Sequence, residues 1–247
     1  MSEIIREHFQ LKETIVTISA KEAGHIDAAK EAIRSQRAYL EEFIRSDPFF
    51  QITLEPYDLY SRPGGTGRAE APAIVRWMVE TSSVFHVGPM AAVAGAIAGF
   101  AVSAMIEEGA AYAVVDNGGD ICILNDQPLL VGIYAGPSPI RDLAFQLPAR
   151  ERPVGICTSS GTVGPSISFG FADAAVAVSR DVALADAAAT ALGNAVTVSG
   201  PLEECFSVVD RPGIEGALLI RGDRMAMWRD LPPLRRVHVG AERITRG

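Results

Sequence analysis

The sequence predicts an α+β fold, a single mixed unit in which strands and helices alternate along the chain. Short runs rich in Ile, Val and Thr predict buried strands, longer segments carry apolar residues at helical spacing, and Gly/Pro turns separate them. No segment repeats at a fixed period, and no linker separates two regimes of composition. With 247 residues, 48% of them hydrophobic, the chain can fill one core, so we expect residues 1–247 to form a single domain.

The first predicted elements are a strand and a long helix. Residues 11–19, LKETIVTIS, predict the strand. From His25 to Arg45 apolar residues recur at steps of four or seven, which predicts an amphipathic helix. It ends before Pro48, because the residue preceding a proline is disfavoured in the helical region. The Gly/Pro-rich segment 61–72 follows as a loop, either an exposed connector or a phosphate-contacting loop built on glycine amides.

Residues 87–106 form a stretch of twenty residues without a charge, which is long enough to cross a bilayer. The stretch contains more Ala and Gly than Leu and Ile, and it includes Pro89. Its flanks carry Glu80, Glu107 and Glu108 in place of Lys and Arg. We therefore expect a buried, closely packed helix here and no membrane span.

The second half of the chain continues the alternation. It carries, in order, a strand over 111–115, the turn DNGGD, strands over 121–124 and 129–134, a turn around 157–166, a strand near 174–179, a helix over 184–196, a strand at 206–209 and a hairpin over 216–228 that turns at Gly222-Asp223.

The composition excludes several classes of function. A net charge of -8 without a cluster of Lys and Arg argues against a nucleic-acid partner. The three cysteines, Cys122, Cys157 and Cys205, fit neither a disulfide framework nor a zinc-ligand spacing, which predicts reduced thiols. Residues 1–16 contain no apolar signal region. We expect a cytoplasmic protein.

The predicted helix over 184–196 carries an acid and a hydroxyl on one face. Asp186 and Thr190 are four residues apart, so their side chains can address one point in space. Two oxygen ligands from one helical turn suit Mg²⁺, whose shell substrate phosphates and water can complete. In the alternative interpretation Asp186 caps free helix amides and Thr190 bonds to a carbonyl of its own turn.

Three segments, one of them within the predicted helix over 184–196, carry a resemblance to a known family. The segment AGFAVSAMIEEGAAYAVVDNGGDI is similar to a Lys-Gly-Tyr-Ala-Val helix followed by a strand and a Gly-Gly-Asp turn. GICTSSGT is similar to an Ile-Ser-Thr-Ser-Gly strand end, and ADAAATAL to an Ala-Asp-Ala-x-x-Thr-Ala helix. In this order they resemble the ApbE family of flavin transferases, which bind FAD with Mg²⁺ and move FMN onto a protein hydroxyl. The likeness covers about residues 90–228 and indicates a divergent branch of the superfamily.

The resemblance implies a fold and a site. The ApbE-like fold has two β-rich lobes with packed helices around a central cleft. Asp186 and Thr190 would be side-chain ligands of Mg²⁺, and Asp120 would add its backbone carbonyl. Gly118 and Gly119 would let the backbone approach the ligand closely. The hydroxyls that would line the flavin or phosphate side of the cleft are those of Thr158, Ser159 and Ser160.

Two departures from the family pattern bear on catalysis. Ala98 stands at the position of the family's lysine, and the segment 163–178, VGPSISFGFADAAVAV, lacks the family's histidine. That histidine is a plausible general base toward the acceptor hydroxyl. Asp173 and His86 are the candidates to replace it. Asp173 can equally be a solvated turn residue, and His86 a satisfied core residue.

The sequence therefore predicts a Mg²⁺-dependent, FAD-binding enzyme that acts at the FAD pyrophosphate, by FMN transfer or by hydrolysis to FMN and AMP. The alternative is a non-catalytic protein of the same fold that binds a flavin or another phosphorylated small molecule. The Ala/Gly-rich helices are compatible with close packing within the chain or between two copies in a homodimer.

Overall fold

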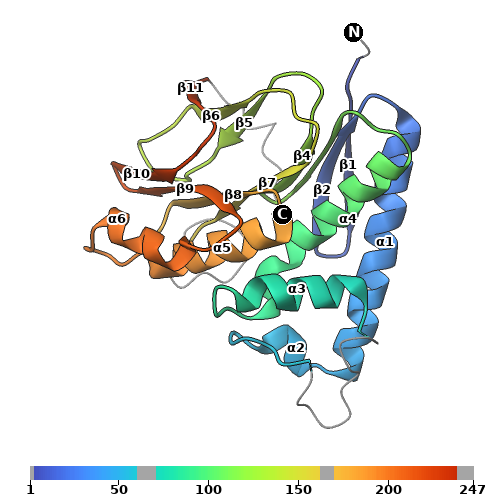
Figure 1. The fold of residues 1–247 in the computed structure, drawn as a ribbon, viewed down its shortest axis with the longest axis horizontal. Helices are drawn as coiled ribbons and strands as arrows, with labels where there is room; N and C mark the ends of the chain where they lie inside the picture. Colours follow the sequence, from blue (N-terminus) through green and yellow to red (C-terminus); the bar gives the residue numbers. More distant parts are fainter. Residues whose placement is uncertain (1–2, 60–70, 162–169, 238–247) are drawn as a thin grey trace.

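The computed structural model describes residues 3–59, 71–161 and 170–237 (Figure 1). Its centre is an eight-stranded sheet in the order β1-β2-β3-β4-β7-β8-β9-β10, in which every neighbouring pair is antiparallel. The strands are β1 (Ile5–Leu11), β2 (Thr14–Ala20), β3 (Ala113–Asn117), β4 (Asp120–Leu124), β7 (Val154–Ser159), β8 (Ala174–Ser179), β9 (Ile214–Arg221) and β10 (Arg224–Arg229).

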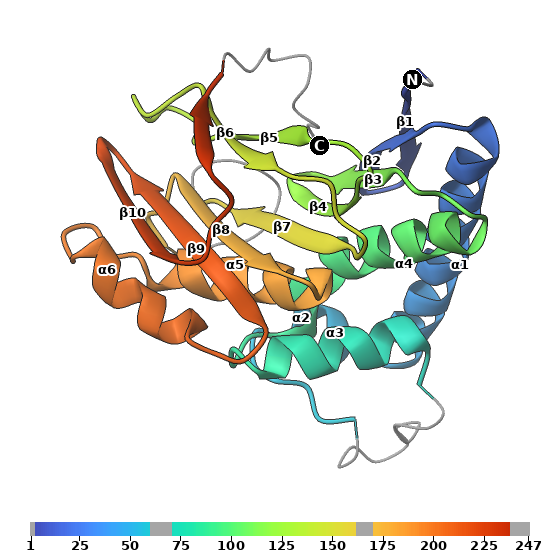
Figure 2. The same ribbon diagram turned by 45° about the horizontal axis from the view of Figure 1, so that its top comes forward.

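A smaller antiparallel sheet covers part of one face of the large one (Figure 2). It consists of β5 (Leu129–Ile133), β6 (Leu143–Leu147) and β11 (Leu234–Arg236), in the order β11-β6-β5. Ile123 on β4 and Ile156 on β7 join Phe145 on β6 in the hydrophobic cluster between the two sheets. Strands β4, β7, β8 and β9 are thus covered on both faces, by the small sheet on one side and by helices on the other. Successive side chains point to opposite faces, so coverage of both faces explains their continuous apolar runs.

Three long helices cover the other face of the large sheet (Figure 2). They are α1 (Ala23–Ser46), α4 (Val93–Glu107) and α5 (Val182–Ala195), and α3 (Ala73–Ser83) packs beside them. The remaining helical segments are short: α2 (Phe49–Ile52), α6 (Leu202–Cys205) and the 3₁₀ turns η1 (Pro89–Ala92) and η2 (Phe206–Val209).

Glycines let α4 approach α5 closely. A Cβ on Gly95 would lie 2.6 Å from the carbonyl oxygen of Val182, and one on Gly99 would lie 2.8 Å from the Val182 side chain. The segment Pro89–Glu107 is long and apolar enough to cross a membrane by length and composition, yet 56% of its most apolar window is buried inside the structure. The expectation of a closely packed helix is confirmed, because α4 contacts α1, α5, β3 and β4.

The predicted α+β fold is confirmed, with two β-rich parts and packed helices. The strand predicted at 206–209 is wrong: these residues form η2, in which Phe206 and Val209, three residues apart, both face the core. The predicted strand over 11–19 is instead the second half of a hairpin whose turn contains Lys12 in a left-handed conformation. The turn predicted around 157–166 begins later, since β7 extends to Ser159.

Candidate functional site

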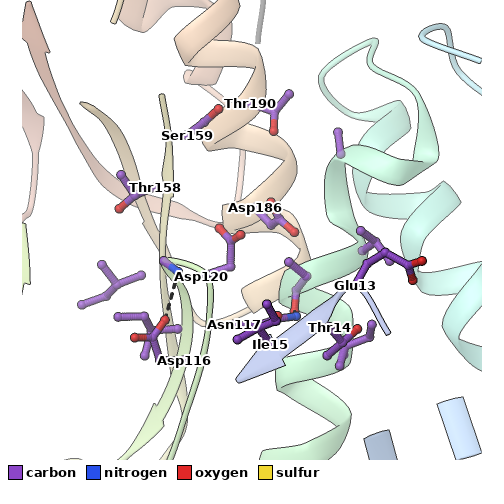
Figure 3. A pocket seen from close by; sticks show the side chains of 18 of the residues that line it. Glu13, Thr14, Ile15, Asp116, Asn117, Asp120, Thr158, Ser159, Asp186 and Thr190 are labelled. Carbon is purple, nitrogen blue, oxygen red and sulfur yellow. Dashed lines mark hydrogen bonds between the residues drawn. The ribbon is translucent and has the colours of Figure 1, made fainter. Parts of the chain in front are cut away.

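A large cleft opens at the end of the main sheet where the β3–β4 turn meets α5 (Figure 3). Its volume is about 2320 Å³, and its walls come from the β1–β2 hairpin, α1, the segment before α4, β5 and the end of β7. The residues predicted from the sequence that line it are His86, Gly118, Gly119, Asp120, Thr158, Ser159, Ser160, Asp186 and Thr190. Side chains distant in the sequence therefore converge on one space.

A tight turn delivers Asp120 to this cleft. Gly118 and Gly119 have φ values of 69° and 103°, and positive φ at both central positions is what a type I′ hairpin turn requires. Asp116 Oδ1 accepts a 2.9 Å hydrogen bond from Gly119 N and closes the turn (Figure 3). A Cβ on Gly118 would contact nothing within 4 Å, so the backbone there faces open space. Asp120 follows as the first residue of β4.

Asp186 lies in the second turn of α5 and does not cap its own helix. The N-cap is Asp181, whose Oδ1 accepts from Leu184 N at 3.1 Å. Asp186 Oδ2 accepts a 2.8 Å hydrogen bond from Gly95 N, in the first turn of α4. Asp186 therefore caps a free amide of the neighbouring helix, α4, and not of its own helix. The residue is only 7% exposed, and its Oδ2 connects α5 with α4.

Thr190 follows one helical turn later on the same face of α5 (Figure 3). Within the described part of the chain, its hydroxyl makes no hydrogen bond to a carbonyl of its own turn. The back-bonding alternative for Thr190 thus finds no support, and its hydroxyl faces the cleft.

Burial destabilises the ionised forms of both Asp120 and Asp186. Burial raises the pKa of Asp186 to about 7, although hydrogen bonds from the backbone of Gly95 and Ala94 act in the opposite direction. Burial also raises the pKa of Asp120 well above its ordinary value, and the charges of Asp186 and Asp116 raise it further. A bound cation would counteract both effects, because a nearby positive charge favours the ionised carboxylate.

A family model described as AbpE bacteria matches residues 2–204. The chain belongs to this family. The UPF0280 protein of Methanothrix thermoacetophila is 60% identical over 244 residues, covering 99% of this chain and 100% of that protein. The UPF0280 protein of Methanosarcina acetivorans is 53% identical over 244 residues, covering 98% of this chain and 93% of that protein.

Solved structures extend the comparison to the fold. The apo form of the flavinyl transferase ApbE of Pseudomonas stutzeri matches with a TM-score of 0.58 and 11% identity, covering 91% of this chain and 94% of that one. The flavin transferase ApbE of Vibrio cholerae matches with a TM-score of 0.52 and 13% identity, covering 92% and 96%. At such low identity these matches concern the fold alone, and they confirm the expected ApbE-like fold. The family model and the UPF0280 relatives confirm the expected divergent branch.

In this member of the AbpE family the hydroxyls at the end of β7 divide between the two faces of the sheet. Ser159 projects toward the helices, on the face of Asp120, whereas Thr158 projects from the other face, on the side of Asp116 (Figure 3). Ser160 Oγ lies 3.5 Å from Ala172 O. All three line the cleft, because the cleft wraps around the sheet end.

The two candidate bases differ sharply in position. His86 is exposed and lines the cleft, in a left-handed conformation with φ of 56°. Asp173 is outside the set of cleft-lining residues, and its Oδ2 accepts from Gly222 N at 2.6 Å, so that it closes the β9–β10 turn. The alternative of a core residue therefore does not hold for His86, which is exposed, and that of a solvated acid does not hold for Asp173, which is buried. Ala98 is fully buried in the core, away from the cleft lining.

Several polar residues of the cleft were not singled out from the sequence. Asn194 follows Thr190 by four residues and extends the same stripe of α5, so the helical spacing could have revealed it. Asn117 donates from Nδ2 to Ala94 O at 3.1 Å and helps to place the start of α4. Arg37 donates to Glu13 and Thr14, a contact that depends on the long-range packing of α1 and has no local signal.

Charge is unevenly distributed around the cleft. Among the described lining residues, the Lys and Arg side chains belong to the β1–β2 hairpin and α1: Arg6, Lys12, Arg37 and Arg45. Lys12 and Arg37 both pair with Glu41. In the part of the chain that the structure describes, no three His, Cys, Asp or Glu side chains cluster as a metal site. A cation near Asp186 would therefore rely on the Asp186 carboxylate, the Thr190 hydroxyl, the backbone carbonyl expected from Asp120 and ligands from a bound substrate.

Proposed function

We propose that this chain binds FAD together with Mg²⁺ in the cleft and acts at the FAD pyrophosphate, transferring FMN to a protein hydroxyl or to water. The observation that carries the proposal is the convergence of Asp120, Asp186 and Thr190 in one cleft of a chain with the ApbE fold. The fold match extends the proposal to the flavin, since the two solved structures are named as flavin transferases.

The donor set fits magnesium. Asp186, Thr190 and Asp120 present oxygen atoms alone, which are the ligands that Mg²⁺ prefers, with substrate phosphates and water to complete its shell. The raised pKa values of Asp120 and Asp186 support the same assignment, because a divalent cation relieves the repulsion between two carboxylates. When bound, Mg²⁺ would neutralise the pyrophosphate and stabilise charge that develops on the leaving AMP phosphate.

The cleft can accommodate a dinucleotide. Typical small-molecule pockets have volumes of roughly 300–1,000 Å³, and this cleft, at about 2320 Å³, leaves room for an acceptor as well. The open backbone at Gly118 permits close approach of the ligand. Ser159 at the end of β7 would donate to the ligand on the side of Asp120, and Thr158 on the side of Asp116; Ser160 follows in the cleft lining.

His86 is the residue that we assign to proton transfer. It is the histidine among the described lining residues, and histidine is the side chain that most often acts as a general base. The acceptor oxygen would form its bond to the phosphorus on the FMN side, the bond from that phosphorus to the AMP oxygen would break, and the acceptor proton would pass to His86. We assign no part in this step to Asp173, because its carboxylate accepts from Gly222 N in the β9–β10 turn.

A non-catalytic protein that binds a flavin or another phosphorylated small molecule is the alternative, and two departures in sequence favour it. Ala98 supplies no cation, and the segment 163–178, of which residues 162–169 lie outside the described range, contains no histidine. The loop over 61–72, for which the sequence leaves open a connector or a phosphate-contacting role, also lies largely outside the described residues. A cytoplasmic location, the absence of a nucleic-acid partner, the homodimer and the single functional unit over 1–247 stay predictions.

Titration of the purified protein with FAD, followed by flavin fluorescence with and without Mg²⁺, tests the proposal. Binding that requires Mg²⁺ and that Asp186→Ala abolishes supports it, and Asp173→Ala is the matched control that retains binding. If the protein does not bind FAD under either condition, the flavin assignment is wrong. If FAD binds but returns intact after long incubation with Mg²⁺ and candidate acceptors, the non-catalytic alternative holds.

A further inference from the structure

A buried asparagine lies beside the turn that delivers Asp120 to the cleft. Asn117 is the last residue of β3, and its cross-strand partner is Asp120, the first residue of β4. Cross-strand partners in an antiparallel pair project to the same face, so the two side chains lie on one side of the hairpin (Figure 3). Asn117 lines the cleft and is only 8% exposed. Its carboxamide is therefore a buried polar group of the candidate metal site.

Two hydrogen bonds connect this carboxamide with Asp186 through one turn of α4. Asn117 Nδ2 donates to Ala94 O at 3.1 Å. The next residue, Gly95, donates from its backbone N to Asp186 Oδ2 at 2.8 Å. Both residues belong to the first turn of α4, where backbone amides have no acceptor within their own helix. The first turn of α4 thus binds β3 through a carbonyl oxygen and α5 through an amide.

Close packing transmits the position of this turn to Asp186. A Cβ on Gly95 would lie 2.8 Å from the Asp186 Cβ and 2.6 Å from the Val182 carbonyl oxygen. The backbone of α4 therefore lies directly against α5 at the residue that bears the carboxylate. A displacement of the first turn of α4 would move the amide that orients Asp186.

We propose that Asn117 is a positioning residue for the metal site. By holding the Ala94 carbonyl it fixes the first turn of α4, and this turn fixes the orientation in which Asp186 meets a divalent cation beside Asp120. The inference rests on the proposed function, since it concerns the same cation. Groups that orient metal ligands from behind typically change metal affinity by about 10- to 100-fold when they are removed.

Two measurements without turnover test the inference. Electron paramagnetic resonance measures the affinity for Mn²⁺ alone, with competition by Mg²⁺. Hydrogen exchange in the metal-free protein measures the protection of the Gly95 amide relative to that of Gly99, an amide inside α4. Asn117→Ala removes the carboxamide, whereas Asn117→Leu removes its polar atoms and keeps a side chain of similar shape.

Asn125→Ala is the matched control. Asn125 follows β4 at the end opposite to Asp120, and it is fully buried. Its Nδ2 also donates to backbone carbonyls, those of Gln127 and Pro148, each at 2.8 Å. It is not among the described residues that line the cleft. Thermal unfolding of each variant establishes that it is folded.

We expect Asn117→Ala and Asn117→Leu to weaken Mn²⁺ binding by about tenfold or more. Both should also speed exchange of the Gly95 amide relative to Gly99, because the first turn of α4 loses its hold on β3. Asn125→Ala should lower the unfolding midpoint and leave both the Mn²⁺ affinity and the relative exchange of Gly95 unchanged.

Three results would overturn the positioning role and leave the proposed metal site intact. The first is unchanged Mn²⁺ affinity in Asn117→Ala. The second is full affinity in Asn117→Leu alone, which would assign the effect of Asn117→Ala to lost volume. The third is weaker Mn²⁺ binding with unchanged exchange of Gly95, which would assign Asn117 a direct contact with the cation. If the unaltered protein binds no Mn²⁺, the metal in the proposed function is wrong and the inference falls with it.

Discussion

Replacement of His86 by glycine or by alanine separates its proposed role in proton transfer from its effect on backbone conformation. After α3 the chain makes the two hydrogen bonds of a Schellman motif, Val87 N to Ser82 O at 3.3 Å and His86 N to Ser83 O at 3.2 Å. His86 occupies the left-handed position of this motif, with φ of 56°. Glycine is the residue usually found there, because it has no Cβ to clash.

The magnitude follows from two opposing terms. A residue with a Cβ loses roughly 1–2 kcal/mol in the left-handed region, whereas glycine loses about 0.5–1 kcal/mol more backbone entropy on folding. We therefore expect His86→Gly to stabilise the fold by about 0.5–1 kcal/mol, which corresponds to a rise of the unfolding midpoint by roughly 1–4 °C in a chain of this size. His86→Ala keeps the Cβ and should leave the midpoint nearly unchanged.

Both variants lack the imidazole, so both should slow AMP release from FAD by about 10²- to 10⁴-fold if His86 accepts the proton. Differential scanning calorimetry measures the stability, and chromatographic detection of AMP measures the rate. Unchanged turnover in both variants would refute the assignment of His86 as the base. A lower midpoint for His86→Gly would refute the strain argument, since it would require imidazole contacts that outweigh the left-handed conformation.

Four further changes test other parts of the account. Asp186→Asn should retain the acceptor for Gly95 N and lose metal affinity, whereas Asp186→Ala should lose both and be less stable than Asp186→Asn by about 1–3 kcal/mol in chemical denaturation. Burial raises the pKa of Asp186 from its ordinary 3.8 to about 7, so the folded metal-free protein holds this proton more tightly than the unfolded chain. The stability of the metal-free protein should therefore fall as pH rises from 4 to 7, by at most about 4 kcal/mol, while Mg²⁺ affinity rises over the same pH range. Unfolding midpoints at several pH values, with and without Mg²⁺, measure both trends. A stability that does not change with pH would count against the raised pKa of Asp186. Gly95→Ala should destabilise the protein by about 1–3 kcal/mol or more, because its Cβ would meet backbone of α5, and Gly24→Ala, in open space, should be neutral or stabilising in the same melting experiment. Asp173→Ala should cost about 1–3 kcal/mol through the lost bond from Gly222 N without changing Mn²⁺ affinity, and a loss of metal binding there would place Asp173 in the site.

Helices, strands and turns that depend on neighbouring residues in the sequence were predicted correctly. The seven-residue and four-residue steps between His25 and Arg45 correspond to α1, and the run AAVAVS to β8. The β3–β4 turn followed from its two glycines, which the left-handed backbone requires. The Asp186 to Thr190 spacing placed both side chains on the cleft face of α5.

The failures share a physical cause, which is dependence on distant contacts. FSVV has strand-forming residues, yet packing against α5 makes it a 3₁₀ turn, with Phe206 and Val209 buried. Asp173 looked like a surface acid because its partner, Gly222 N, is 49 residues away. The same holds for the hydrogen bond from Gly95 N to Asp186, which joins α4 and α5. The two residues are 91 positions apart in the sequence, so local spacing cannot reveal the bond.

The most direct test of the central claim is release of AMP from FAD by the purified protein, measured by chromatography with and without Mg²⁺ and with Asp186→Ala alongside. We expect AMP and FMN, free or protein-bound, in equal amounts, only with Mg²⁺ and only from the unaltered protein. Release that persists in Asp186→Ala, or FAD that stays intact with Mg²⁺ present, would contradict it.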